Sequence, residues 1–253
     1  YSSSDTVSPT AASYAAAGIT GVTANNLGMI NDLLGSGLAN PTSAAELQAL
    51  VDALNKLLAG ADGILNDGSN LTAADFALLG LGSLNTSLEV AIANGLLDGK
   101  TANQVSSSAA LSAMAVAVSK LAATADATSS QNAPSGPGAL TVNDLLALGI
   151  TGVTQDSLAA VIAAIIADPG STDLANSKVT SLEDLQQLVN AAIARRVLDL
   201  AASTIAAFDG SGTEGVGSGA GFTGAPGRCR CGRCKGIKQA RRAEQSGQTG
   251  GSF

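Results

Sequence analysis

The chain contains no histidine and no tryptophan, and aromatic residues make up only 2% of its 253 residues. Because histidine is the commonest general acid/base and the commonest metal ligand, its absence excludes most catalytic triads and most histidine-based zinc or phosphotransfer sites. The phosphate-binding motif G-x-x-x-x-G-K-[S/T] is also absent. The sequence therefore predicts a protein that is not an enzyme and that needs no cofactor.

Long hydrophobic runs are lacking too. The most apolar run, residues 158–167, has about half of the roughly 20 residues that a membrane-spanning helix needs, so we expect no membrane span. Hydrophobic residues still make up 45% of the chain and the mean hydropathy is +0.28, which argues against a fully disordered protein. The chain starts at Tyr1 with a polar run, as expected after removal of a signal peptide, and this start predicts an extracellular or cell-surface location.

What the sequence does contain is an internal repeat. Three similar segments run from Thr10 to Gly18, from Thr72 to Gly80 and from Thr141 to Gly149. A second motif at residues 42–51 recurs at 180–189, and in degenerate form at 101–121. Self-similarity at a spacing of about 60–70 residues is typical of repeat proteins. The sequence therefore predicts three pseudo-repeats.

Each repeat is predicted to be a small unit of three helices, which makes the fold class all-α. The first helix starts at the threonine, with Asp75 or Asp144 completing a capping box, and ends at the glycine. Thr23 and Thr154 are predicted to cap the second helix. The third helix is the longest, and its apolar stripe is expected to be buried. In the last repeat this stripe consists of Leu185, Leu188, Val189, Ile193, Val197 and Leu200.

The predicted domain boundaries follow from these motifs. They are a polar N-terminal segment (1–9), repeat 1 (10–62), a degenerate repeat 2 (71–124), a linker (125–139), repeat 3 (140–208) and a glycine-rich, then basic tail (209–253). The linker and the polar termini are predicted to be flexible. The sequence leaves open whether the repeats are separate domains or one array.

Two phrases in the first repeat carry a resemblance to a known class of protein. AAGITGVTANNL (residues 16–27), followed by AELQALVDA (residues 45–53), resembles the small α-helical repeats of very large bacterial surface proteins and adhesins. The resemblance covers the first repeat well and the third fairly well. It implies a cell-surface or matrix context rather than a particular chemistry.

The tail holds every cysteine of the chain in a C-x-C-x-x-C pattern, formed by Cys229, Cys231 and Cys234. Thiolates with this spacing bind zinc, but a structural site needs four ligands, so a second chain or a carboxylate would have to complete it. The odd number of cysteines instead favours disulfides within or between molecules. A third interpretation is a solvated tail in which the cysteines have no role.

The same tail is strongly basic. Its seven positive residues are Arg228, Arg230, Arg233, Lys235, Lys238, Arg241 and Arg242. With one glutamate they give the last 26 residues a net charge of +6 and leave −13 on the other 227. This asymmetry predicts electrostatic docking on an acidic neighbour, whether a copy of the chain, another surface protein or a polyanion. Without interleaved aromatic residues, sequence-specific nucleic-acid binding is not expected.

These observations lead to two hypotheses of function. The first is an extracellular structural protein that self-assembles as a homo-oligomer or homopolymer into a filament, a surface layer or a biofilm matrix. The second is a monomeric adhesin or binding module that recognises a cell-surface or host ligand. Sequons for glycosylation at Asn70 and Asn85 are compatible with export in both cases.

Overall fold

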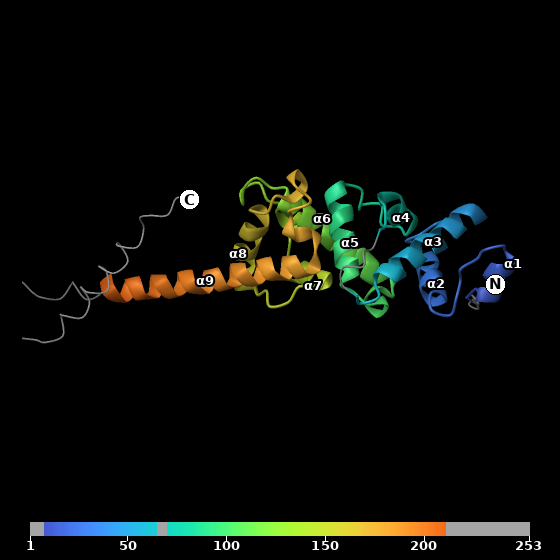
Figure 1. Cartoon of the computed structure of the whole chain (residues 1–253), viewed down its shortest axis with the longest axis horizontal. Coiled ribbons are helices and arrows are strands. Elements are labelled where there is room, and N and C mark those ends of the chain that lie inside the picture. The colour runs from blue at the N-terminus through green and yellow to red at the C-terminus, as the bar shows by residue number, and fades with distance from the viewer. Residues whose placement is uncertain (1–7, 65–69, 211–253) are drawn as a thin grey trace, which may run out of the picture. The chain divides into compact units, whose positions relative to one another are not determined.

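The structure, a computed structural model, describes residues 8–64 and 70–210 (Figure 1). Within these residues the secondary structure is helical, and the one extended pairing is an isolated bridge between Asp62 and Thr101. The predicted all-α class is therefore confirmed. Contacts assign the chain up to Ala206 to one compact unit and residues 207–253 to a second. The first of these units holds all the features described below.

The helices follow one another along the chain in a short, medium, long order that occurs three times. They are α1 (Ala11–Ala16), α2 (Leu27–Gly35), α3 (Ala44–Gly60), α4 (Ala73–Leu78), α5 (Ser87–Asp98), α6 (Ser108–Ala125), α7 (Val142–Leu148), α8 (Gln155–Ile166) and α9 (Leu182–Gly210). Four 3₁₀ turns lie between them, η1 (Ala102–Val105), η2 (Gly136–Gly138), η3 (Gly170–Thr172) and η4 (Lys178–Thr180).

The short helices α1, α4 and α7 begin and end in the same way. Thr10, Thr72 and Thr141 each accept a hydrogen bond from the N–H three residues on, and the side chain there bonds back to the threonine N–H. After each helix a glycine takes a positive φ, 81° at Gly18, 80° at Gly80 and 99° at Gly149. Glycine adopts this conformation without strain. The predicted starts and stops of these helices are confirmed.

The medium helices differ in how they begin. Thr154 caps α8 as predicted, and Thr86 caps α5 in the same way. The prediction that Thr23 caps α2 is wrong, because α2 begins at Leu27 after an N-cap at Asn26. The Asn26 side chain, which is 2% exposed, accepts from the Thr23 N–H at 2.7 Å and donates to Asn55 on α3 at 2.7 Å. This buried amide stabilises a turn over residues 23–26, so α2 begins only at Leu27.

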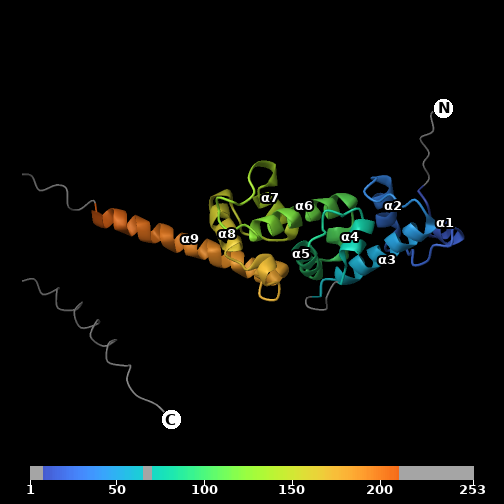
Figure 2. The same cartoon turned by 90° about the horizontal axis from the view of Figure 1, so that it is seen from above.

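The buried apolar residues of α1 to α9 form one continuous cluster that runs from Tyr14 to Ala192. Helix α6 is central to it and packs against α5, α7 and α8 (Figure 2). Among the described helices, α6 is the one with the length and composition to cross a membrane, and half of it is buried inside the protein. Such burial is typical of a core helix. The expectation of no membrane span stays a prediction.

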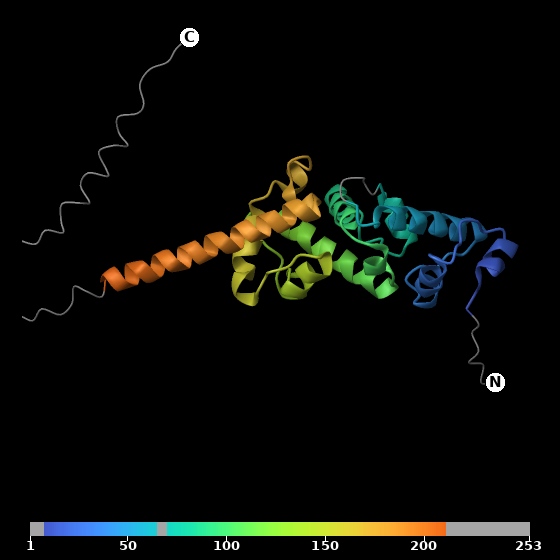
Figure 3. The same ribbon diagram turned by 60° about the horizontal axis from the view of Figure 1, so that its bottom comes forward.

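The long helix α9 departs from the predicted burial. Leu185 and Val189 are fully buried, but Val197 is 62% exposed and Leu200 is 63% exposed. All residues from 194 to 207 are exposed. The prediction that Val197 and Leu200 belong to the core is wrong, because α9 continues beyond the helices against which its first half packs (Figure 3). Periodicity reports an apolar face of a helix but not where its partner ends.

Candidate functional site

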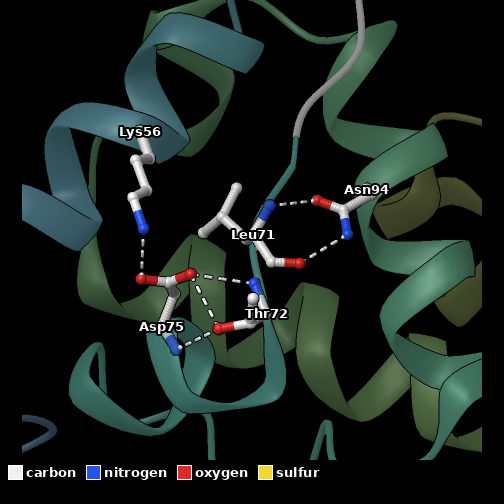
Figure 4. A network of polar contacts seen from close by, with 5 residues as sticks. All are labelled: Lys56, Leu71, Thr72, Asp75 and Asn94. Carbon is white, nitrogen blue, oxygen red and sulfur yellow. Dashed lines mark hydrogen bonds and ion pairs between the residues drawn. The ribbon is translucent and has the colours of Figure 1, made fainter.

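The junction between α3 and α4 is held by a network around Asp75 (Figure 4). The carboxylate of Asp75 accepts from Lys56 Nζ on α3 at 2.9 Å, and it also accepts from the backbone N–H and hydroxyl of Thr72. Burial raises the pKa of Asp75, but the bonds from Lys56 and Thr72 together hold it below its ordinary value. Asn94 on α5 adds two hydrogen bonds to the backbone of Leu71, just before α4. One carboxylate thus both caps α4 and ties it to α3.

The junction between α6 and α7 repeats this arrangement. Lys120 on α6 lies 3.0 Å from the carboxylate of Asp144, the third residue after the capping Thr141. The two side chains are 19% and 14% exposed, so this pair is more enclosed than Lys56 with Asp75. Burial raises the pKa of Asp144, and the bonds from Thr141 and Lys120 outweigh this and lower it overall. Both lysines stand thirteen residues after a serine, Ser43 or Ser107, that caps the long helix.

Close backbone approaches join other segments, namely the end of α4 to the segment after α2, and α5 to the segment before α9. A Cβ on Gly80 would lie 2.0 Å from the carbonyl oxygen of Leu38, and a Cβ on Gly95 would lie 1.8 Å from that of Thr180. At the corresponding contact of α2, Asp32 accepts from the Ser108 N–H at the start of α6, and this bond lowers the pKa of Asp32. Helix α2 therefore supports the start of α6, and α5 supports the start of α9, in both cases the long helix that comes four helices later.

One buried cation of the described residues, Lys100, lies between the end of α5 and helix α7. Lys100 is 5% exposed, and its Nζ donates to the carbonyl oxygen of Ala147 at 3.3 Å. Burial lowers its pKa, because removal from water disfavours the charged form. Sequence reasoning missed this residue, since nothing in the local sequence distinguishes a buried lysine from an exposed one.

We expect Lys100→Met to raise the free energy of unfolding by about 1 kcal/mol at neutral pH, because it removes a charge whose desolvation is not offset by a carboxylate. The folded-state pKa lies below the unfolded-state value of about 10.4, so wild-type stability rises as pH increases between the two values. Urea titrations at neutral and alkaline pH measure both effects. Lys178→Met, at an exposed lysine, is the control and should change neither quantity.

Helices α8 and α9 enclose a groove with a volume of about 470 Å³. It is lined by Ala160, Ala163 and Ala164 on α8, by Ala167 directly after α8, and by Ala192, Arg195, Arg196 and Asp199 on α9. Helix α9 also carries four large aliphatic side chains that are 62–69% exposed, namely Val197, Leu198, Leu200 and Ile205. We call the groove together with these four side chains and the exposed Ala194 the α8–α9 face. Its small and apolar residues suit contact with another protein surface.

The first helix of the chain presents a second uncovered surface. Ala12, Ser13, Ala15 and Ala16 on α1 are all exposed. A Cβ on Gly18 would have no described atom within 4 Å, whereas one on Gly80 would clash with Leu38. We call Ser13, Ala15, Ala16 and Gly18 the α1 face. Ser13 occupies the same third position after a capping threonine as Asp75, which is 7% exposed.

Most of the residues that the sequence predicted as sites lie outside the part of the chain that the structure describes. Cys229, Cys231, Cys234 and the basic positions from Arg228 to Arg242 lie outside the described residues, so the proposals made for them stay predictions. Asn70 and Asn85 are both exposed, and glycosylation there also stays a prediction. In the part of the chain that is described, no group of three or more acidic, cysteine or histidine residues has the geometry to hold a metal ion.

Comparison with known proteins gives no assignment: no protein-family model, no curated protein and no solved structure matches the chain.

Proposed function

We propose that the protein is an extracellular structural protein that assembles with its own copies through its helical body. The observation that carries this proposal is the presence of four large aliphatic side chains, each more than 60% exposed, on α9, the helix that also lines an alanine-rich groove. Fully burying one such side chain contributes about 1.5–3 kcal/mol, so covering this surface with protein is favourable. Large apolar side chains exposed together on one helix are candidate association sites.

The body is proposed to be an array of three units, α1–α3, α4–α6 and α7–α9. Matching side-chain contacts support it, because the Thr20 N–H donates to Gln48 at 2.8 Å and the Thr151 N–H donates to Gln186 at 2.9 Å. The ion pairs at the α3–α4 and α6–α7 junctions occupy matching positions as well. In repeat proteins each unit contacts only its neighbours, so the surfaces at the two ends of an array are left uncovered.

The extracellular setting rests on the sequence, through its resemblance to surface-protein repeats and its polar start. A filament, a surface layer and a biofilm matrix are the assemblies that this setting suggests. The basic tail, with its net charge of +6, is proposed to add electrostatic docking on acidic neighbours. We propose no catalytic role.

The alternative proposal is a monomeric adhesin or binding module. The observation that favours it is the same groove between α8 and α9, whose volume of about 470 Å³ suffices for a small part of a surface ligand. In that case the α8–α9 face would be covered by the ligand rather than by another copy.

Light scattering coupled to size-exclusion chromatography, with negative-stain imaging of the same samples, separates the two proposals. Self-assembly predicts a mass that grows with protein concentration and extended particles at the highest concentrations. A second series with reductant shows whether Cys229, Cys231 and Cys234 contribute. A strictly monomeric protein at high concentration in both series would contradict self-assembly and support the binding module.

A further inference from the structure

We propose that the α8–α9 face of one molecule binds the α1 face of a second, so that copies join head to tail. This inference rests on the proposed function and names the two surfaces that carry it. At the two junctions inside the chain, the same kinds of surface are already in contact.

The ion-pair positions give the first argument. At each internal junction, the residue thirteen places after the capping serine of a long helix contacts the residue three places after the capping threonine of the next short helix. These pairs are Lys56 with Asp75 and Lys120 with Asp144. Ser181 starts α9, where it accepts from the Asp184 N–H, and the residue thirteen places later is Ala194. In a second copy, the residue that would face Ala194 is Ser13, three places after the capping threonine of α1. Both residues are exposed.

The medium helices give the second argument. Asp32, Gly95 and Ala163 each stand nine residues after a threonine at the start of their segment, Thr23, Thr86 and Thr154. The start of α6 covers Asp32 and the start of α9 covers Gly95. Ala163 is exposed and lines the groove. The segment that would cover Ala163 in the same way is the start of the next long helix after α9. In a head-to-tail contact this is the start of α3 in a second copy.

The glycines that end the short helices give the third argument, from the opposite surface. Gly80 lies against Leu38, and Gly149 lies near the Nζ of Lys100, so both approach the unit before their own. Gly18 has no described neighbour in the corresponding space. The two uncovered faces are therefore the two halves of a contact that the chain makes twice within itself.

The α8–α9 face differs from the internal junctions in its charge. Arg195 and Arg196 stand where α3 has Leu57 and Leu58, and an ion pair is lacking because Ala194 and Ser13 are uncharged. The two arginines suit the acidic body of a second copy, which carries −13 over residues 1–227. Contact between copies is thus weaker than contact between units of one chain, and it is reversible. Since the two faces are different surfaces, the contact joins copies head to tail, and it produces an open chain of molecules where the rotation between successive copies does not close a ring.

The first test installs the missing pair. Ser13→Asp with Ala194→Lys recreates the arrangement of the internal junctions, and both positions are exposed, so folding is preserved. We expect the dissociation constant of self-association, measured by sedimentation equilibrium, to fall about fivefold relative to either single variant. Ser13→Lys with Ala194→Lys should raise it by a similar factor, because like charges then meet. Equal dissociation constants for the two double variants would overturn the inference.

The second test separates head-to-tail contact from other modes. Ala163→Arg fills the groove and leaves the α1 face usable, whereas Ser13→Arg blocks the α1 face and leaves the groove usable. Each variant alone should be monomeric, and an equimolar mixture should form a 1:1 dimer and nothing larger. Ala12→Arg is the matched control on α1, because its counterparts Ala74 and Asn143 stay exposed at the internal junctions, and it should assemble like the wild type.

The outcomes of this test distinguish the inference from the proposed function. A wild-type chain that is monomeric at every concentration contradicts the proposed function itself. A wild type that assembles together with a Ser13→Arg variant that assembles equally well overturns the inference alone, because the α1 face is then not used. Loss of assembly in Ala163→Arg without recovery in the mixture also overturns it, and indicates symmetric pairing of α9 with a second α9. Circular dichroism of each variant confirms that it is folded.

Discussion

Replacing Gly80 by alanine is expected to lower the free energy of unfolding by about 3–4 kcal/mol. Two effects add, because an alanine at a φ of 80° costs about 1–2 kcal/mol and its Cβ would lie 2.0 Å from the Leu38 carbonyl oxygen. The clash involves backbone, which does not rotate away as a side chain does. Either the end of α4 or the segment after α2 must move, and the junction between α3 and α4 loosens with it.

Gly18→Ala is the matched control. Gly18 has a φ of 81° and ends α1 as Gly80 ends α4, but no described atom lies within 4 Å of the added Cβ. We therefore expect a loss of only about 1 kcal/mol, which isolates the backbone strain. Urea denaturation of both variants gives the difference, which is the cost of the close approach. Equal losses in the two variants would mean that Leu38 does not pack against Gly80 as described.

The second large effect is expected at the enclosed ion pair. Asp144→Ala removes the return bond of the α7 capping box and leaves Lys120, which is 19% exposed, without its carboxylate. Losing one partner of a fully buried pair costs about 3–5 kcal/mol and a cap costs about 1 kcal/mol. For this partly buried pair we expect a loss of about 3 kcal/mol at neutral pH.

The pH dependence of this loss follows from the pKa of Asp144, which is lower in the folded than in the unfolded state. A carboxylate with a lowered pKa stabilises the fold fully above its unfolded-state pKa of about 3.9 and loses this contribution as pH falls through its folded-state pKa. The difference between wild type and Asp144→Ala should therefore shrink below about pH 4. Denaturation curves at neutral pH and near pH 3 measure it.

Ser13→Ala is the matched control for Asp144→Ala. Ser13 completes the same capping box in α1, where it is exposed and where no lysine of the described residues pairs with it. The expected loss is about 0.5 kcal/mol, from the cap alone. If both substitutions cost the same, Lys120 does not depend on Asp144 and the ion pair contributes nothing measurable.

The features predicted correctly from the sequence are those set by a few neighbouring residues. A threonine, a polar residue three places on and a glycine eight places on determine the ends of α1, α4 and α7. The prediction at Thr23 was wrong because Asn26 competes for the same backbone, through a contact with Asn55 that is 29 residues distant. Local motifs do not report such competition.

The features that the sequence did not reveal depend on distant partners. Asp75 and Asp144 were explained by their capping boxes alone, but their lysine partners come from the preceding long helix, 19 and 24 residues away. Val197 and Leu200 continue the apolar stripe of α9, yet the helices that cover its first half do not extend so far. The candidate site could therefore not be predicted from the sequence, because a helix face stays exposed only where no other helix packs against it.

The ion pairs at the internal junctions also decide which surfaces a second molecule is able to displace. If the α1 helix of another copy replaced α7, Ser13 would stand opposite Lys120 and leave that largely enclosed ammonium group without a carboxylate. Insertion of the α1 helix of a second molecule at this junction is disfavoured by this loss. Binding of α1 at the α8–α9 face leaves no buried charge without a partner, because Ala194 is uncharged. In the proposed assembly, the charge pattern thus favours binding of an incoming α1 helix at the end of the proposed array over its insertion at an internal junction.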